Sequence, residues 1–319
     1  MGGMPESLPD LQATKLLHGK VNTESIKTCE KDDSEYRSYD AETTPPKVIE
    51  HYRCMRSKQT LAFVEMMEEK YKFDEKTGEG RRQMTIEEAF SELEHYVDAS
   101  DPDLDLPNRL HLLQTAEGIR RAGHPEWLQL TGLLHDMGKI MFLWGNGDIG
   151  QDGLSPNGEQ WALGGDTFVV GCEFPSECIL PEFNSLNPDM SDPRYNTKYG
   201  VYKPNCGLNE LKIAWGHDEY MFRMLMANKT LIPREGLDII RYHSFYPWHS
   251  KGAYRHLMNS TDYETMEWVQ LFNAFDLYTK DEENVLDETE VSERASERAS
   301  EEVDAMRALL LHQLFLCVL

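Results

Sequence analysis

His135, Asp136 and Lys139 interrupt an otherwise apolar stretch, residues 131–145, with the sequence TGLLHDMGKIMFLWG. Its apolar residues recur at helical spacing, which predicts a buried helix with His135 and Lys139 on one face. Ionisable groups in an apolar helix are unfavourable unless something pairs with them. A divalent ion such as iron, manganese or zinc would pair with a neutral imidazole beside a carboxylate. The alternative is a His and an Asp satisfied by hydrogen bonds on a solvated edge.

Residues of the same kinds occur on four further predicted helices. These helices cover residues 109–122, 209–228, 233–244 and 262–278, and they carry His111, His217, His243 and Asp276. Each of these residues alone is more often a satisfied core group than a metal ligand. Together with the first pair they provide more groups than the roughly three protein ligands of one catalytic zinc. The set therefore predicts two ions in a helical bundle, with one carboxylate as a bridge.

The other predicted elements also favour a mostly helical fold, and the sequence contains no βαβ alternation, GxGxxG motif or P-loop. One long helix is expected over residues 47–71. Thr85 and Glu88 form a capping box for a helix that continues to Val97. Asn108 is expected to cap the helix that follows it.

A long irregular insertion separates the helix over 131–145 from the later helices. Residues 145–209 are rich in Gly, Pro, Asn and Asp, so only short strands such as TFVVG, forming a short hairpin, are expected. An irregular region of this length in a compact domain is usually functional. We therefore expect it to form a wall of the site.

Composition excludes several classes of function. The chain has 319 residues, 40% of them hydrophobic, and a net charge of -24, which argues against nucleic acid or an anionic membrane as partner. The six Cys form no CxxC pair, the N-terminus lacks a secretory signal, and no apolar run is long enough to span a membrane. We therefore expect a cytoplasmic protein with reduced thiols, and the acidic surface favours a monomer.

Three segments are expected along the chain. Residues 1–34 form a polar, disordered segment, residues 35–280 form a single helical domain, and residues 281–319 form a tail with two SERA repeats and an apolar end. The domain assignment for residues 35–280 depends on the motifs described next.

The order His111, His135-Asp136 and Asp276 resembles the H…HD…D pattern of the HD-domain metalloenzyme superfamily, whose members are mostly phosphohydrolases. The sequences that flank these residues are more specific and resemble those of the myo-inositol oxygenase family. They are DASDPDLDLPN, QTAEGIRRAGHPEW, LTGLLHDMGKIMFLWG, GGDTFVVGC, NPDMSDPRYNTKYGVY, CGLNELKIAWGHDEY, IIRYHSFYPWH and WVQLFNAFDLYTK. The resemblance covers roughly residues 35–280.

This resemblance implies an HD-type helical domain with a non-haem di-iron centre, ferrous at one iron and ferric at the other. The implied reaction is ring cleavage of myo-inositol by O₂ to D-glucuronate and water, the first step of inositol catabolism. The substrate would chelate one iron through adjacent hydroxyl oxygens, and O₂ would bind the other. By motif match, Asp136 bridges the two irons. The first iron also takes His111, His135 and Asp276, and the second takes His217 and His243.

A neutral polyol must be held by hydrogen bonds because it has no charge. Lys139 lies one helical turn after His135 and could stabilise a developing alkoxide, whereas the alternative is a surface lysine. The motif match also implies that Asp98 accepts hydrogen bonds from substrate hydroxyls.

Four further substrate-binding residues follow from the same match. Gly165 and Asp166 in GGDTF would offer a backbone group and a carboxylate to the polyol, and Ser244 follows the ligand His243. Arg37 matches an N-terminal segment that covers the site in the family, which would exclude water.

Two departures from the family pattern leave alternatives open. The segment before GDTF is longer than expected, and the tail after Lys280 replaces the usual C-terminal end. One alternative is an HD-type phosphohydrolase, but its phosphate would need clustered Arg and Lys where the sequence offers Lys139 and an acidic loop at 101–105. The other alternative is a non-catalytic relative that binds iron without consuming O₂.

Overall fold

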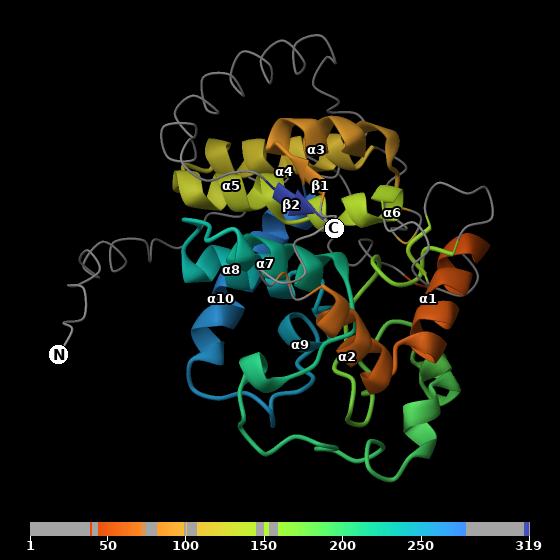
Figure 1. Ribbon diagram of the computed structural model, residues 1–319. Coiled ribbons are helices and arrows are strands. Elements are labelled where there is room, and N and C mark those ends of the chain that lie inside the picture. The colour runs from red at the N-terminus through yellow and green to blue at the C-terminus, as the bar shows by residue number, and fades with distance from the viewer. Residues whose placement is uncertain are drawn as a thin grey trace, which may run out of the picture.

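The expected mostly helical architecture is confirmed by the computed structural model (Figure 1). Arg37, the segment 1–34 and most of the tail 281–319 lie outside the residues that the structure describes. So do the whole acidic loop 101–105 and parts of the irregular insertion. The described residues are 39, 44–71, 73, 82–98, 100, 107–144, 150–152, 159–278 and 316–318.

The long helix expected over 47–71 is wrong, because the chain forms two helices there. Helix α1 spans Pro46–Lys58 and α2 spans Leu61–Lys70. Thr60 is extended and its side chain accepts a hydrogen bond from the backbone N–H of Phe63, as an N-cap does. The buried side chain of Gln59 bonds to the backbone N and O of Trp215. The break therefore fastens α1 to the segment around Trp215, which follows the irregular insertion.

The capping box at Thr85 and Glu88 is confirmed, with α3 spanning Ile86–Glu92 and a 3-10 turn continuing over Leu93–His95. Strand β1, Arg82–Met84, precedes this helix and pairs antiparallel with β2, Leu316–Val318. The sequence analysis did not predict this pairing.

Helices α4, Asn108–Arg121, and α5, Glu126–Leu134, lie side by side (Figure 1). The residue at the N-cap position of α4 is Pro107, so the expected cap by Asn108 is wrong. The side-chain amide of Asn108 instead donates to the carbonyl oxygen of Asp136, at 3.4 Å.

The single helix expected over 131–145 is also wrong. Helix α5 ends at Leu134, a 3-10 turn follows over Met137–Ile140, and α6 spans Met141–Trp144. The His-Asp pair lies in the break, where the ring of His135 bonds to a carbonyl of the preceding turn. A Cβ on Gly138 would lie 2.2 Å from the carbonyl oxygen of His217, so this turn must pack directly on later backbone.

The irregular insertion is a series of turns. Its 3-10 helices are Pro181–Leu186, Pro188–Ser191 and Leu208–Glu210. In place of the expected hairpin, Val169 in the described part of the insertion forms an antiparallel bridge with Ile213, which follows the insertion. The buried Arg56 of α1 holds the insertion, because its guanidinium bonds to Ile179 O and Asn184.

The later helices agree with the sequence analysis more closely. Helix α7 spans His217–Ala227, so it begins at His217, a predicted metal ligand, rather than at residue 209. Helix α8 spans Arg234–Tyr242 after Pro233 at the N-cap position, and a short α9 spans Tyr246–His249. Helix α10, Asp262–Tyr278, has the expected bounds.

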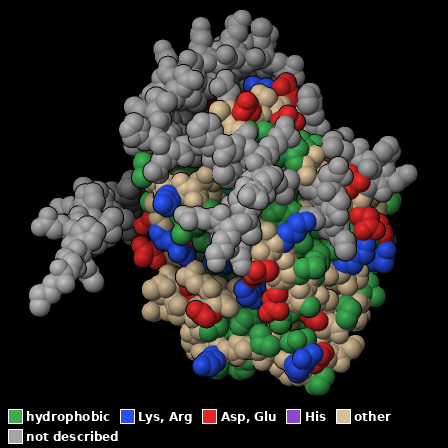
Figure 2. All heavy atoms as spheres, in the orientation of Figure 1, with side chains coloured by type: hydrophobic (Ala, Val, Ile, Leu, Met, Phe, Trp, Pro, Cys, Tyr) green, Lys and Arg blue, Asp and Glu red, His purple; other side chains and the backbone are tan. Residues whose placement is uncertain are grey.

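In Figure 1, α7 and α8 lie beneath α4 and α5, and α10 packs against α8. Buried aromatic side chains fill two clusters around this arrangement, one with Tyr52, Phe142 and Trp215, and the other with Phe245 and Phe272. None of the helices in the described ranges is long and apolar enough to cross a bilayer. On the face seen in Figure 2, acidic and basic side chains of the described residues are interspersed.

Candidate metal centre and substrate wall

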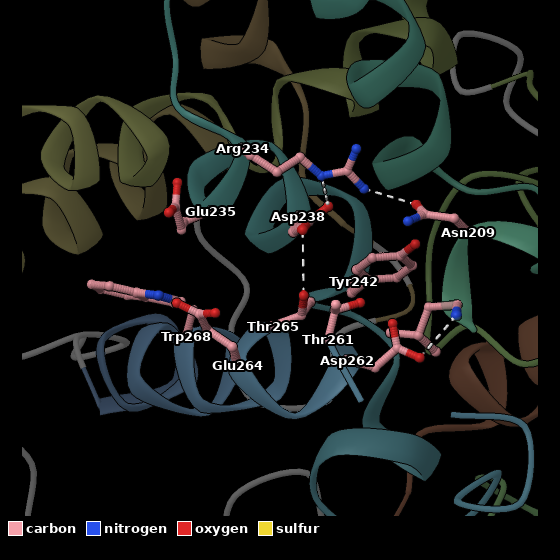
Figure 3. A pocket seen from close by; sticks show the side chains of 11 residues that line it. Asn209, Arg234, Glu235, Asp238, Tyr242, Thr261, Asp262, Glu264, Thr265 and Trp268 are labelled. Carbon is pink, nitrogen blue, oxygen red and sulfur yellow. Dashed lines mark hydrogen bonds and ion pairs between the residues drawn. The ribbon is translucent and has the colours of Figure 1, made fainter. Parts of the chain in front are cut away.

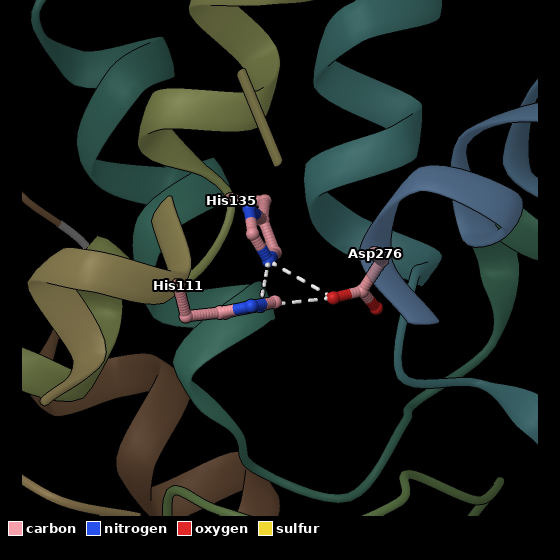
Figure 4. Close-up of side chains that lie close together, drawn as sticks. All are labelled: His111, His135 and Asp276. Atoms are coloured by element: carbon pink, nitrogen blue, oxygen red, sulfur yellow. Dashed lines mark hydrogen bonds and ion pairs between the residues drawn. The ribbon is translucent and has the colours of Figure 1, made fainter. Parts of the chain in front are cut away.

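His111, His135 and Asp276 converge from three helices on one point (Figure 4). His111 Nε2 lies 3.2 Å from His135 Nε2 and 3.0 Å from Asp276 Oδ1. His135 Nε2 lies 3.4 Å from the same carboxylate oxygen. All three side chains are buried. Helices α4 and α10 and the end of α5 therefore form one half-site.

His217 and His243 form a second half-site beside the first. His217 is the first residue of α7 and His243 is the C-cap residue of α8, so two helix ends meet here. Their Nε2 atoms are 3.1 Å apart. Both side chains are almost fully buried.

The carboxylate of Asp136 lies between the two half-sites and faces both. Its Oδ1 is 2.9 Å from His217 Nε2 and 3.4 Å from His243 Nε2. Its Oδ2 is 3.7 Å from His111 Nε2 and 3.8 Å from His135 Nε2. One oxygen toward each pair of imidazoles is the arrangement that a bridging carboxylate requires.

Backbone carbonyls fix the rings of three of the histidines. His135 Nδ1 lies 2.8 Å from Gly132 O, and His217 Nδ1 lies 2.6 Å from Leu163 O. His243 Nδ1 lies 3.0 Å from Ile240 O. A carbonyl oxygen only accepts, so each Nδ1 carries the proton and each Nε2 is left with a bare lone pair.

This donor set fits metal ions. The bare Nε2 lone pairs of His217 and His243 face each other and a carboxylate oxygen, which is repulsive without a cation between them. Ligand atoms about 2.1 Å from one ion, at roughly right angles, would be about 3 Å apart, close to the separations found here. The residues therefore fit metal binding through nitrogen and oxygen ligands, and the number of ions stays a prediction.

Lys139 links the Asp136 carboxylate to Asp98. Asp98 is one of the predicted substrate-binding residues Asp98, Gly165, Asp166 and Ser244, which we call the substrate wall. The Nζ of Lys139 lies 2.6 Å from Asp136 Oδ2 and 2.8 Å from Asp98 Oδ2. Burial by itself lowers the pKa of Lys139, but the two carboxylates more than offset it and hold that pKa above its ordinary value. Burial likewise raises the pKa of Asp98, and Lys139 and the hydrogen bonds from Ser100 reverse this. Lys139 is therefore a buried ammonium between two carboxylates.

A cavity opens over the ligands and includes several of the predicted substrate-binding residues. Its lining has Asp98, Lys139, Gly165 and Ser244 in addition to the predicted metal ligands other than His135. Asp166 lies behind this surface, where its Oδ1 accepts a hydrogen bond from the Tyr52 hydroxyl at 3.3 Å. The structure therefore brings the described residues of the predicted site together. Asp166 does not line the cavity itself but adjoins Gly165, which does.

The sequence of the chain matches the profile of the family described as myo-inositol oxygenase over residues 46–293. The chain belongs to the myo-inositol oxygenase family. It is 43% identical to "Inositol oxygenase" of Danio rerio over 259 residues, 80% of this chain and 86% of the relative. It is 44% identical to "Inositol oxygenase" of Mus musculus over 253 residues, 78% and 82% of the two chains. It is 45% identical to "Inositol oxygenase 1" of Arabidopsis thaliana over 247 residues, 77% and 75%.

The sequence analysis of this myo-inositol oxygenase family member missed two residues near the site, Tyr52 of α1 and Ser100. Tyr52 lies within the helix expected over residues 47–71, with no role predicted for it, but its hydroxyl bonds to Asp166 and lies 2.9 Å from that of Tyr39. Ser100, which also lines the cavity, donates to Asp98 Oδ1 at 2.6 Å. Tyr52 and Asp166 are 114 residues apart, so no local spacing could have paired them.

A larger cavity of about 290 Å³ lies away from the metal ligands, between α8 and α10 (Figure 3). Its polar groups pair with one another. Arg234 Nε bonds to Asp238 Oδ1 at 2.7 Å, and Asp238 Oδ2 accepts from Thr265 at 3.4 Å. None of the predicted ligands lines this cavity, so its size does not make it the reactive site.

Proposed function

We propose that this member of the myo-inositol oxygenase family cleaves the ring of myo-inositol with O₂ to give D-glucuronate and water. Two iron ions, one ferrous and one ferric in the active state, are held in the two half-sites. The observation that carries the proposal is the Asp136 carboxylate, which directs one oxygen to each half-site. The membership of the family supports the choice of substrate.

In this proposal His111, His135 and Asp276 would hold the first iron, His217 and His243 would hold the second, and Asp136 would provide a ligand oxygen to each. When bound, the irons activate O₂ and hold the hydroxyl oxygens of the substrate. The protein keeps the ligand histidines in one tautomer through the backbone carbonyls of Gly132, Leu163 and Ile240.

Lys139 and Asp98 provide complementary polar groups for a neutral polyol. The ammonium of Lys139 donates to a substrate oxygen and stabilises negative charge that develops on it. The carboxylate of Asp98 accepts from a neighbouring hydroxyl. The pair is held in place, because Lys139 is buried and its Nζ is 2.8 Å from Asp98 Oδ2.

The remaining wall orients the ring of the substrate. Gly165 offers backbone groups and Ser244 offers a hydroxyl. Asp166 bonds to the Tyr52 hydroxyl and so orders the turn that contains Gly165. Arg37 is proposed to help cover the site. Tyr39, two residues later, packs its ring on that of Tyr52 with centroids 5.1 Å apart.

A phosphohydrolase is less well supported. Among the described residues that line the cavity, Lys139 is the one cationic side chain, and two carboxylates already pair with it. A phosphate would therefore meet excess negative charge instead of a cluster of Arg and Lys.

The test is O₂ uptake by the iron-loaded, partly reduced protein, with and without myo-inositol, while glucuronate is followed. We expect uptake only with myo-inositol and one glucuronate per O₂. Two bound irons without uptake would show a different substrate or a non-catalytic relative, and a phosphatase assay on the same sample covers the alternative. Failure to bind iron would reject the constellation of ligands.

We also propose a cytoplasmic monomer. The described cysteines with assigned side chains are free thiols, and the net charge of -24 opposes self-association. Light scattering of the purified chain tests the oligomeric state, and a dimer of stable mass would contradict it.

A further inference from the structure

His51 is a buried histidine of α1 that lies against the substrate wall and outside the predicted set of metal ligands. Its relative exposure is 9%, and its ring meets that of Tyr52 edge to face, with centroids 5.6 Å apart. Burial lowers the pKa of His51, although the charge of Asp98 acts in the opposite direction. The ring is therefore neutral and has one N–H to donate.

The N–H of the His51 ring donates a hydrogen bond to the turn that carries the substrate wall. His51 Nε2 lies 3.1 Å from Gly164 O, and a carbonyl oxygen can only accept. The next residue of α1 holds the other side of the same turn, because the Tyr52 hydroxyl lies 3.2 Å from the backbone N of Asp166. Consecutive side chains of α1 thus fasten the residues on either side of Gly165.

The turn packs closely against α1 and against Asp98 and Ser100. A Cβ on Gly165, where φ is +80°, would lie 3.0 Å from His51 Nε2. On the other side, a Cβ on Gly164 would lie 2.8 Å from Ser100 Oγ and 3.2 Å from Asp98 Oδ1. Gly164 therefore packs between His51 and Asp98, the residue proposed to accept a hydrogen bond from the polyol.

The same short segment also reaches the ligands and the far wall. Leu163 O accepts from His217 Nδ1 at 2.6 Å, and Thr167 N donates to Ser244 O at 2.9 Å. The bond from His51 lies between these two contacts. Since His217 has its own carbonyl partner, loss of the His51 bond would release the substrate wall before it released the metal ligand.

We propose that His51 is a positioning residue that fixes the Gly164–Asp166 turn and thereby sets the affinity of the site for the polyol. This inference rests on the proposed function, because it takes Gly165 and Asp166 as part of the substrate wall. His51 itself does not touch the reacting atoms.

The test compares variants that lack the donor with one that keeps a donor at the same distance from the backbone. His51→Phe keeps a ring, and His51→Leu removes the donor with less bulk in case the first variant does not fold. His51→Gln retains an N–H near the position of Nε2. Loss of the donor leaves the buried carbonyl of Gly164 without a hydrogen bond. The less well held turn should lower the affinity for the polyol about tenfold.

We expect His51→Phe and His51→Leu to raise the KM and the calorimetric Kd for myo-inositol about tenfold. We expect kcat to change less than about threefold and the iron content to equal that of the wild type. His51→Gln should recover most of the affinity. His256→Phe is the matched control, since His256 Nε2 makes a similar bond to Lys198 O at 2.8 Å on the exposed surface.

Each remaining outcome overturns the inference in a distinguishable way. If the wild type binds and turns over myo-inositol but both donor-free variants keep its Kd, His51 does not position the wall and the proposed function stands. If the variants lose iron together with affinity, His51 is a general structural residue. If the iron-loaded wild type does not bind myo-inositol at all, the proposed function fails, and this inference fails with it.

Discussion

Asp136 is the residue on which the two half-sites depend. Its two oxygens face different pairs of imidazoles, and Lys139 lies 2.6 Å from one of those oxygens. The carboxylate of Asp136 thus contacts both half-sites, and through Lys139 it also reaches the substrate wall. The residue types predicted that one carboxylate would bridge two ions, because carboxylate beside imidazole suits a divalent ion. The resemblance to the family assigned that role to Asp136, and it stays a prediction.

Asp136→Asn should reduce the iron content from two to about one or fewer per chain, because a neutral amide does not bridge two cations. Turnover should fall at least about 100-fold. Metal analysis of the reconstituted variant and an oxygen-electrode assay check these results. Asp238→Asn is a suitable control, because Asp238 is a buried carboxylate outside the site. Retention of two irons and full turnover would show that the ligand assignment is wrong.

At the scale of elements, the site is built from helix ends. His135 and His243 are both C-cap residues, each with its ring on the carbonyl three residues earlier, and His217 begins α7. The sequence pattern predicted a continuous helix through His135, since its apolar spacing continues across the break. The break depends instead on packing against α7, which no local spacing encodes.

Gly138→Ala should disrupt this packing. The added Cβ would lie 2.2 Å from His217 O, so the turn after Asp136 must move away from α7. We expect a loss of about 1–3 kcal/mol in the free energy of unfolding, as for other overpacked sites. The affinity for the second iron should also fall. Urea unfolding and iron titration measure the two effects.

Gly123→Ala is the matched control for Gly138→Ala. Gly123 has a φ of +77° and nothing within 4 Å of an added Cβ, so the variant strains the backbone without a clash. It should lower stability and leave iron binding unchanged. Equal iron affinity in both variants would reject the packing argument.

Asp238, between α8 and α10, should make stability depend on pH. Burial raises its pKa above the ordinary value of 3.8, and Arg234 and Thr265 oppose this only in part. The folded state thus binds the proton more tightly than the unfolded state. The contribution of Asp238 to stability is greatest below about pH 3.8 and falls as pH rises through the folded pKa.

Asp238→Asn removes this dependence. Compared with the wild type, the variant should gain stability as the pH rises from about 3.8 through the folded pKa of Asp238, and keep that gain at higher pH. Urea unfolding of both proteins across this range checks the sign. Glu235→Gln, a change on the same cavity wall, controls for the loss of one negative charge. A gain that grew as pH fell would contradict the argument.

At the scale of the whole molecule, the sequence predicted the helical class, the bounds of α10 and the capping box before α3. It did not predict the pairing of β1 with β2, which joins residues more than 230 positions apart in the chain. It also missed the support of the wall by α1, because His51 and Tyr52 meet partners more than 100 residues away. Local patterns predict the ligand types, whereas the wall depends on long-range contacts.

Removal of iron should destabilise the whole domain, because buried imidazoles and carboxylates lose the cations that pair with them. Metal at about 100 times its Kd stabilises a fold by about 2.7 kcal/mol. For a chain of this size we expect chelation to lower the Tm by about 5–10 °C. Calorimetry with and without chelator measures the shift, and Asp136→Asn should show a smaller one. An unchanged Tm would indicate that the polar cluster is stable without metal.

The carbonyl bonds to the histidine rings also bear on how quickly the centre fills. A freely rotating side chain must give up its rotational entropy when it captures an ion. The rings of His135, His217 and His243 have lost that freedom already, through Gly132, Leu163 and Ile240. Folding has therefore met this entropic cost in advance. The rate of metal uptake is then set by how fast an ion sheds its water and reaches the interior, rather than by a search among side-chain rotamers.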